Sequence, residues 1–250
     1  MRKATAGTAV VAAVLLAALL LTAPRHGAGR RAAAEPVPGG ATGSPPAIDH
    51  PEPETLPAGP VAAADGGSRS GPGGIPLGFP RTADGAVAAG TAWLTVLEGV
   101  GMLDATRRPA LLAAIGDATF AAAADRRIAA RAAGLAPPAG PDSGYVVALA
   151  RPASGAYRVL DGGESAVRCE VWYPYQLAVR SDGAPPPVAR WYRAQLALRW
   201  DDQRGDWLLT ADPVFADGPD PGEPSPPFAA RTAALAESGP GWHTYADAQE

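Results

Sequence analysis

The side chains that most often perform chemistry are scarce in this 250-residue chain. Its three histidines, His26, His50 and His243, lie outside the stretch that we expect to fold. A histidine general base, a serine triad or a zinc site with imidazole ligands needs histidine held by a packed scaffold. We therefore expect no catalytic residue, no metal site and no bound cofactor, and we predict a protein that is not an enzyme.

Two further groups of residues have the composition of a site but a simpler interpretation. Cys169 is the only cysteine, so the chain cannot form an intrachain disulfide. It falls on the apolar face of an expected strand, where burial opposes formation of the reactive thiolate, and we interpret it as a core residue. Asp201, Asp202 and Asp206 form an acidic cluster without the spacing of a calcium loop, which favours a solvated hairpin turn.

The charge of the chain argues against a nucleic-acid partner. Lys and Arg total 21 against 25 Asp and Glu, and the formal net charge is -4. Binding to phosphate backbones depends on a concentrated excess of Lys and Arg, which release counterions from the nucleic acid. No basic stripe of this kind is present in the expected domain, so we expect protein partners or self-association instead.

A candidate partner surface follows from the alternation of side chains along two expected strands. Trp172 and Trp191 fall on the polar side of their strands, and Arg193 and Arg199 lie on a polar strand face as well. Aromatic and arginine side chains are enriched where proteins meet their partners. These four residues therefore form a possible partner surface. The alternatives are helices that cover the tryptophans and simple solvation of the arginines.

The N-terminal segment has the properties of a membrane helix. The run from Thr5 to Ala23 contains no charged side chain. Its nineteen residues span roughly 28 Å as a helix, close to the roughly 30 Å thickness of a bilayer's hydrocarbon core. We predict a retained single-pass anchor at residues 5–23, with the globular domain extracytoplasmic. The alternative is a signal peptide cleaved after Ala34 and a secreted protein, although that site lies far beyond the apolar run.

Composition divides the rest of the chain into three parts. Residues 24–80 contain 12 Pro and 12 Gly and almost no large apolar side chains, which predicts a disordered linker. Residues 81–215 regain periodically spaced apolar side chains and are long enough for one domain. Residues 216–250 are again rich in Pro and Gly, and we expect a low-order tail with one possible short helix at residues 229–236.

Within residues 81–215 the apolar period changes from helical to alternating. We expect three helices, at about residues 82–98, 109–116 and 117–134. Five strands follow, at about residues 145–150, 156–160, 167–179, 192–200 and 207–209. A bend or bulge is expected at Pro174, because proline cannot donate to a strand ladder. Helices followed by a run of strands predict an α+β fold in which the N-terminal helices pack on a curved antiparallel sheet.

This order of elements resembles nuclear transport factor 2-like and cystatin-like folds. In such an arrangement the helices and the sheet enclose a pocket, here with Trp93, Tyr173 and Trp200 as its expected lining. An extracytoplasmic small-ligand-binding module that uses this apolar pocket is therefore one functional hypothesis.

Six short motifs together resemble a known group of proteins. They are Gly78-Phe79-Pro80-Arg81-Thr82, Gly85-Ala86-Val87-Ala88-Ala89, Met102-Leu103-Asp104, Glu170-Val171-Trp172, Leu198-x-Trp200 and Gly205-Asp206-Trp207. Their order and spacing are similar to those of poorly characterised membrane-anchored proteins of conjugative elements in GC-rich Gram-positive bacteria. The resemblance covers about residues 77–215, and the turn before Trp207 and the alanine-rich third helix depart from it. It implies a non-enzymatic accessory or scaffold protein of a conjugation or type IV secretion-like apparatus.

Overall fold

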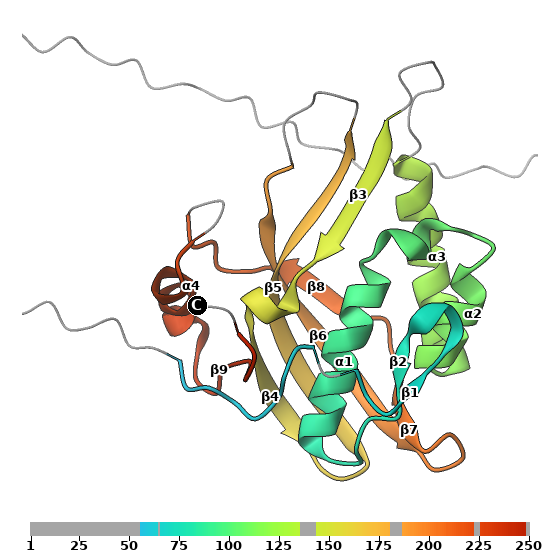
Figure 1. The fold of residues 1–250 in the computed structure, drawn as a ribbon, viewed down its shortest axis with the longest axis horizontal. Helices are drawn as coiled ribbons and strands as arrows, with labels where there is room; N and C mark the ends of the chain where they lie inside the picture. Colours follow the sequence, from blue (N-terminus) through green and yellow to red (C-terminus); the bar gives the residue numbers. More distant parts are fainter. Residues whose placement is uncertain (1–55, 65, 136–143, 181–186, 223–225, 249–250) are drawn as a thin grey trace, which may run out of the picture. The chain divides into compact units, whose positions relative to one another are not determined.

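The structure is a computed structural model that describes residues 56–64, 66–135, 144–180, 187–222 and 226–248. In this described part, four α-helices accompany a seven-stranded antiparallel sheet (Figure 1). The predicted α+β class with an antiparallel sheet is therefore confirmed. No helix among the described residues is long and apolar enough to cross a membrane, and the predicted anchor at residues 5–23 lies outside the described residues.

The three predicted helices of the domain form where the sequence signals place them. Helix α1 (Ala83–Leu97) begins at Thr82, whose hydroxyl accepts a hydrogen bond from the Gly85 N–H at 3.0 Å. Helix α2 (Arg108–Ile115) has proline in its first turn. Helix α3 (Ala118–Gly134) begins at Asp117, whose carboxylate accepts from the Phe120 N–H at 2.9 Å. Local capping therefore sets the start of two of the three helices.

The long strand β5 (Ala166–Arg180) organises the sheet. It pairs with β6 (Arg190–Asp201) along one edge. Its other edge pairs first with β4 (Ala156–Gly162) and then with β3 (Tyr145–Ala150). The remaining strands of this sheet are β7 (Asp206–Leu209), β8 (Val214–Asp217) and β9 (His243–Thr244). A separate two-stranded ribbon pairs β1 (Arg69–Ser70) with β2 (Pro76–Leu77).

Pro174 does not interrupt the sheet, because its missing N–H points to the other edge of β5. The register between β5 and β6 is continuous through the Pro174–Trp191 pair, so the bulge expected at this proline is absent from that ladder. The Pro174 carbonyl accepts from the Arg151 N–H at 3.1 Å, which shows that this residue faces the junction where β4 ends and β3 begins. A proline at such a junction removes no hydrogen bond to β6. A shift in register lies in the pairing of β4 with β5 instead, between Val159 and Asp161.

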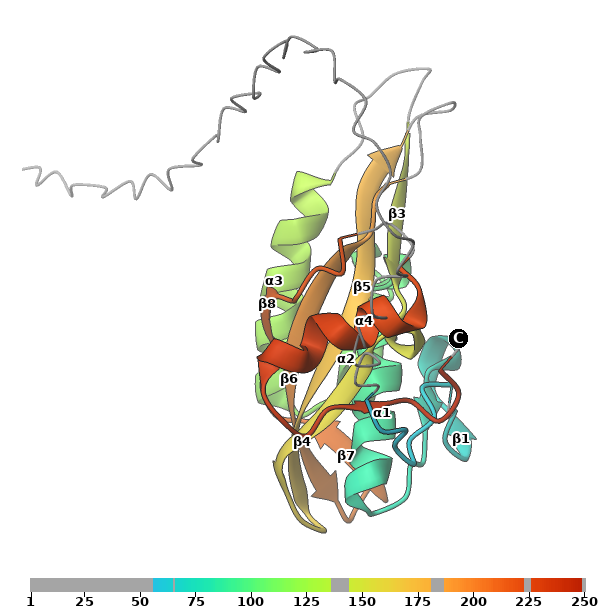
Figure 2. The ribbon, with the colours of Figure 1, turned by 90° about the vertical axis from the view of Figure 1, so that its left-hand side faces the viewer.

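Helix α1 lies against the inner face of the sheet and contributes most of its own length to the core. Gly90 marks the closest approach, because a methyl group there would lie 2.9 Å from Leu196 Cδ1. The Cys169 side chain is fully buried in the same layer, and desolvation raises the pKa of its thiol to about 12. The interpretation of Cys169 as a core residue is confirmed. Figure 2 shows α4 on the face of the sheet opposite to α1.

The folded unit begins well before residue 81. Val61, Ile75 and Phe79 are buried in the main core, although they lie in the segment that composition assigned to the linker. Phe79 packs edge-on against Trp93 with ring centroids 5.9 Å apart, and the Trp93 indole donates to the Pro76 carbonyl at 2.9 Å. Residues 56–80 thus differ from the expected disordered linker. A few isolated apolar side chains anchor a Pro- and Gly-rich segment, and average composition does not detect them.

The tail is also more ordered than its composition indicated. Helix α4 (Phe228–Leu235) occupies the position of the possible short helix, and β9 pairs with β4. Trp242 and Tyr245 are buried, and the Tyr245 hydroxyl lies 3.0 Å from Thr91 Oγ1. His243 therefore belongs to a folded strand rather than to a low-order tail. These two large aromatic side chains help to hold the segment on the domain, because each buries a large apolar area.

Candidate functional site

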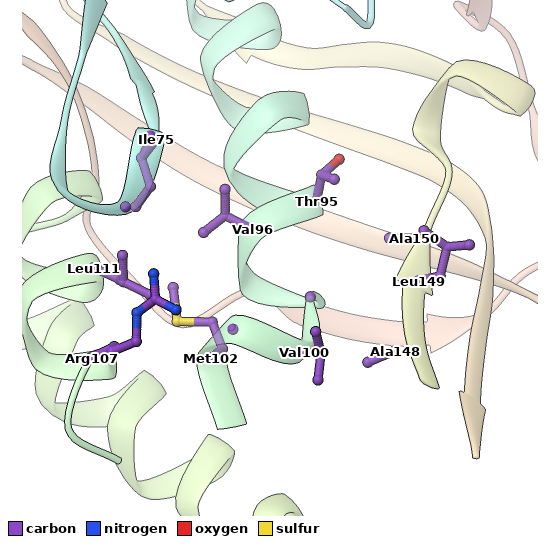
Figure 3. A pocket seen from close by; sticks show the side chains of 14 residues that line it. Ile75, Thr95, Val96, Val100, Met102, Arg107, Leu111, Ala148, Leu149 and Ala150 are labelled. Atoms are coloured by element: carbon purple, nitrogen blue, oxygen red, sulfur yellow. The ribbon is translucent and has the colours of Figure 1, made fainter. Parts of the chain in front are cut away.

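The candidate site is a surface groove along strand β3. Its first lobe has a volume of about 320 Å³ and lies between β3, the end of α1 and the loops next to them. Figure 3 shows side chains from these separate segments around one space. The lobe is lined by Gly73, Gly74, Ile75, Thr95, Val96, Gly99, Val100, Gly101, Met102, Arg107, Leu111, Ala148, Leu149 and Ala150. Thirteen of these fourteen residues are uncharged, so most of the lining is apolar or formed by glycine backbone.

A second lobe continues the first past the end of β3. It has a volume of about 390 Å³ and shares Thr95 and Ala150 with the first lobe. Ala63 and Ala64 line it from the N-terminal segment, and residues 151–154 line it from the loop after β3. The two lobes therefore adjoin, and we call them together the β3 groove.

Local sequence explains why this surface is hollow. Gly73 and Gly74 have φ values of 67° and 81°, a left-handed conformation that favours glycine, so this wall of the groove has no side chains. Gly99 and Gly101 flank Val100 where α1 ends and a short 3₁₀ helix (Val100–Leu103) begins. The groove consequently combines glycine backbone with larger apolar side chains such as Ile75, Met102 and Leu111, and Val100 is 55% exposed.

Strand β3 presents an unpaired edge to this groove. The hydrogen bond from the Arg151 N–H to the Pro174 carbonyl shows that the backbone groups of Arg151 point toward β5. Because the N–H and C=O groups of successive residues point to opposite edges of a strand, this bond fixes the direction for the rest of β3. By this alternation Val146, Ala148 and Ala150 turn their N–H and C=O groups away from β5. Among the described residues, β3 pairs with β5 and with no second strand. An exposed edge of this kind is a template for another chain.

The electrostatics of the groove are one-sided. Arg107 lines the first lobe and Arg151 lines the second, and both are exposed. Neither lobe is lined by an aspartate or a glutamate. No ion pair is formed by either arginine within the described part of the chain. The groove therefore carries two arginines that form no ion pair with a described carboxylate, on a mostly apolar surface. The nearest acidic group to its second lobe is Asp247, which accepts from the Ala63 and Ala64 N–H groups at 2.7 Å and 2.9 Å.

A buried charged cluster lies elsewhere, where α1 meets α3. Glu98 at the end of α1 accepts from Arg131 Nη1 at 2.6 Å and lies 3.7 Å from Arg127 Nη1. Arg127 also donates through Nε to Asp212 at 2.8 Å. The two carboxylates and two guanidinium groups balance in charge. The cluster thus joins α1, α3 and the segment between β7 and β8.

Several polar atoms in this cluster have no hydrogen-bond partner among the described residues. They include Glu98 Oε1, Arg127 Nη2, Arg131 Nε and the Tyr175 hydroxyl. Burial, followed by the neighbouring Glu98 carboxylate, raises the pKa of Tyr175, so this phenol stays protonated at neutral pH. We assign the cluster a structural role, because its carboxylates are already held by arginines and no pocket described for this chain reaches it.

The three residues expected to line a ligand pocket are not brought together as a lining. Trp93 and Tyr173 are packed core residues that are 0% and 1% exposed. Trp200 is half-buried near Trp207 at a ring distance of 5.6 Å, with the Arg81 guanidinium 5.6 Å above it. None of the three lines the β3 groove or the other described pockets.

The expected partner surface is covered by the tail. Trp172 and Trp191 stack with ring centroids 4.0 Å apart and are buried in a cluster that includes Leu235 of α4 and Trp242. The Trp172 indole also donates to the Pro219 carbonyl at 3.1 Å. Of the two expectations for these tryptophans, a partner surface or a covering helix, the structure has the covering helix. The helix comes from the tail rather than from the N-terminal helices.

The two arginines of that expected surface have separate environments. Arg193 is partly exposed and lies 3.9 Å from Glu170, whereas Arg199 is exposed. Sequence reasoning missed the groove, because its lining comes from segments far apart in the sequence and includes Gly73, Gly74 and small alanines, which are common throughout this chain. One feature of the sequence does point to the groove: Arg151 directly follows the strand predicted at residues 145–150, and the sequence does not define a second strand beside it.

Among the described residues, no group of three or more His, Cys, Asp and Glu side chains is placed to hold a metal ion.

Comparisons with protein-family models, with curated proteins and with solved structures found no match for this chain. The groove and its chemistry are consequently the basis for a functional assignment.

Proposed function

We propose that this chain is a non-enzymatic protein-binding module of a membrane-anchored assembly. The observation that supports this proposal is the β3 groove, where a strand edge lies beside a mostly apolar surface with two arginines, and where neither the edge nor the arginine side chains have a partner among the described residues. Exposed strand edges and apolar grooves are the features through which folded domains recognise segments of other proteins. A small ligand is usually enclosed on most sides, whereas the β3 groove consists of two adjoining surface depressions.

The wider assignment extends the sequence-based expectations. Residues 5–23 would hold the chain in the membrane as a retained anchor, and the domain would act outside the cytoplasm. The role would be that of an accessory or scaffold protein of a conjugation or type IV secretion-like apparatus. The placement of α1 on the inner face of a curved antiparallel sheet is compatible with a nuclear transport factor 2-like or cystatin-like domain, and a shared fold by itself does not specify function.

Site-specific photo-cross-linking in cells that naturally express the chain tests this proposal. A photoreactive phenylalanine analogue replaces Leu149 in the groove, and the same analogue at Arg126 on the exposed side of α3 is the matched control. We expect discrete cross-linked adducts from position 149 that are absent from position 126, with membrane or secretion-apparatus proteins as the attached partners. Identical adduct patterns at both positions, or none at 149, would contradict a binding role for the groove.

A further inference from the structure

We infer that the β3 groove takes an extended, acidic peptide segment of another protein, which adds to the sheet as a strand beside β3. This inference rests on the proposed protein-binding function and names the chemistry of the partner. Three independent features of the groove lead to it: the orientation of the β3 backbone, the shape of the facing wall, and the sign of the charge.

The backbone of β3 is oriented for strand addition. Ala148 and Ala150 line the groove, and their N–H and C=O groups point away from β5. Leu149, whose side chain lies on the opposite face of the sheet, lines the groove as well. Because residues from both faces of β3 contribute, the groove meets the strand at its edge. A segment lying there can exchange main-chain hydrogen bonds with residues 148 and 150.

The facing wall leaves room for the side chains of an added strand. Gly73, Gly74, Gly99 and Gly101 present backbone only, and a methyl group at Gly74 or Gly101 would meet no atom within 4 Å. On the β3 side the lining residues are two alanines and one leucine. Alternate side chains of a bound strand would therefore enter apolar space on one side and face solvent on the other.

The charge of the groove selects an acidic segment. Arg107 and Arg151 lie in different lobes, and no carboxylate lines either lobe. These positive charges stand out in a chain whose formal net charge is -4. Charge complementarity favours a partner that carries carboxylates toward both ends of the bound segment and disfavours a basic one.

Two other occupants fit these features less well. A second copy of this chain, paired β3 to β3 about a two-fold axis, would bring the same two arginines toward each other. The chain's own acidic stretch at residues 49–54 contains no large apolar side chain for the apolar wall of the groove, and Pro51 and Pro53 leave it only one edge that can donate hydrogen bonds. A segment of a different protein satisfies both the hydrogen-bonding and the charge requirements.

Selection from a random peptide library tests the inference. A phage-displayed library of twelve-residue peptides is selected against the full-length chain in lipid nanodiscs. It is also selected against the double variant Arg107→Glu with Arg151→Glu, and against Arg126→Glu as a matched charge reversal outside the groove. Affinities of the enriched peptides are then measured with each protein, and circular dichroism verifies that the variants are folded.

We expect enriched peptides that combine Asp or Glu with β-branched and aromatic residues. Their binding should weaken at least about tenfold in the double variant and stay unchanged in Arg126→Glu. N-methylation of alternate backbone amides should abolish binding in one alternation and leave it intact in the other, because a strand uses only every second N–H for one edge.

The inference would be overturned by enrichment of basic or helical peptides, by no enrichment, or by equal binding to the double variant. Ala148→Pro provides a second measurement. It removes an N–H that points away from β5, so the sheet keeps its ladder while the added strand loses a donor. Photo-cross-linked partners without acidic strand binding would leave the proposed function standing and this inference refuted. Binding of acidic strands in vitro without cross-linked partners in cells would refute the proposed function and leave the binding chemistry of the groove standing.

Discussion

At the scale of single residues, the buried Glu98 is a side chain whose charge should contribute to stability. Its carboxylate is 4% exposed and accepts from Arg131, with Arg127 nearby. Glu98→Gln keeps the shape and removes the charge, which leaves two guanidinium groups partly uncompensated. Breaking one partner of a buried ion pair costs about 3–5 kcal/mol, so we expect the free energy of unfolding to fall by that amount in chemical denaturation.

The matched control for this prediction is Glu164→Gln, the same substitution at an exposed position that forms no described ion pair. We expect a change within about 0.5 kcal/mol for the control. Equal stability of the two variants would mean that the charge of Glu98 is not needed to hold α1 against α3.

Single residues also show which predictions from sequence were possible. Alternation along one strand was enough to identify Cys169 as a core residue, because the inner face of the sheet is buried in the usual way. The same rule placed Trp172 and Trp191 correctly on the opposite face but left open what covers them. Their cover is α4, more than 35 residues away in sequence, and alternation within a strand carries no information about such contacts.

At the scale of elements, the C-terminal segment depends on one clamp. Arg158 of β4 donates two hydrogen bonds to the buried Glu170, at 2.6 Å and 2.8 Å, and one to the Ser238 carbonyl at 3.0 Å. Its guanidinium also lies 4.6 Å above the Trp242 ring. Arg158→Ala removes all of these contacts and leaves Glu170 without its main partner. We therefore expect α4 and β9 to loosen, with faster amide hydrogen exchange in residues 228–245.

Arg168→Ala is the control for the clamp. Arg168 pairs with Asp161, and both side chains are more than half exposed, so loss of this pair should have little effect on stability and leave exchange in the tail unchanged. Comparable acceleration in both variants would show that the tail does not depend on Arg158.

The elements themselves were mostly visible in the sequence. Helices with a capping side chain and strands with a long alternating pattern form where they were expected, as in α1, α3 and β5. Of the bend or bulge predicted at Pro174, the bulge is absent from the β5–β6 ladder, because the missing N–H of Pro174 faces the edge of β5 that β3 and β4 share. The β3 groove was not predicted for the same reason, since an unpaired edge is a property of the whole sheet order.

At the scale of the whole molecule, composition underestimated the folded unit at both ends. Val61, Ile75 and Phe79 precede residue 81, and Trp242 and Tyr245 follow residue 215, yet all five are buried. Averages over Pro- and Gly-rich windows conceal such isolated anchors. The predicted linker and tail boundaries were therefore drawn where apolar side chains become sparse, rather than where packing ends.

These outer segments should decide whether the domain folds at all. Each fully buried large apolar side chain contributes about 1.5–3 kcal/mol, and a domain is stable by only about 5–15 kcal/mol in total. Loss of the five side chains named above is comparable to that whole margin. We expect a fragment of residues 81–215 to lack a cooperative thermal transition by circular dichroism, and a fragment of residues 56–248 to show one. A cooperative transition in the shorter fragment, at a midpoint close to that of the longer one, would mean that the outer segments pack on a domain that is already complete.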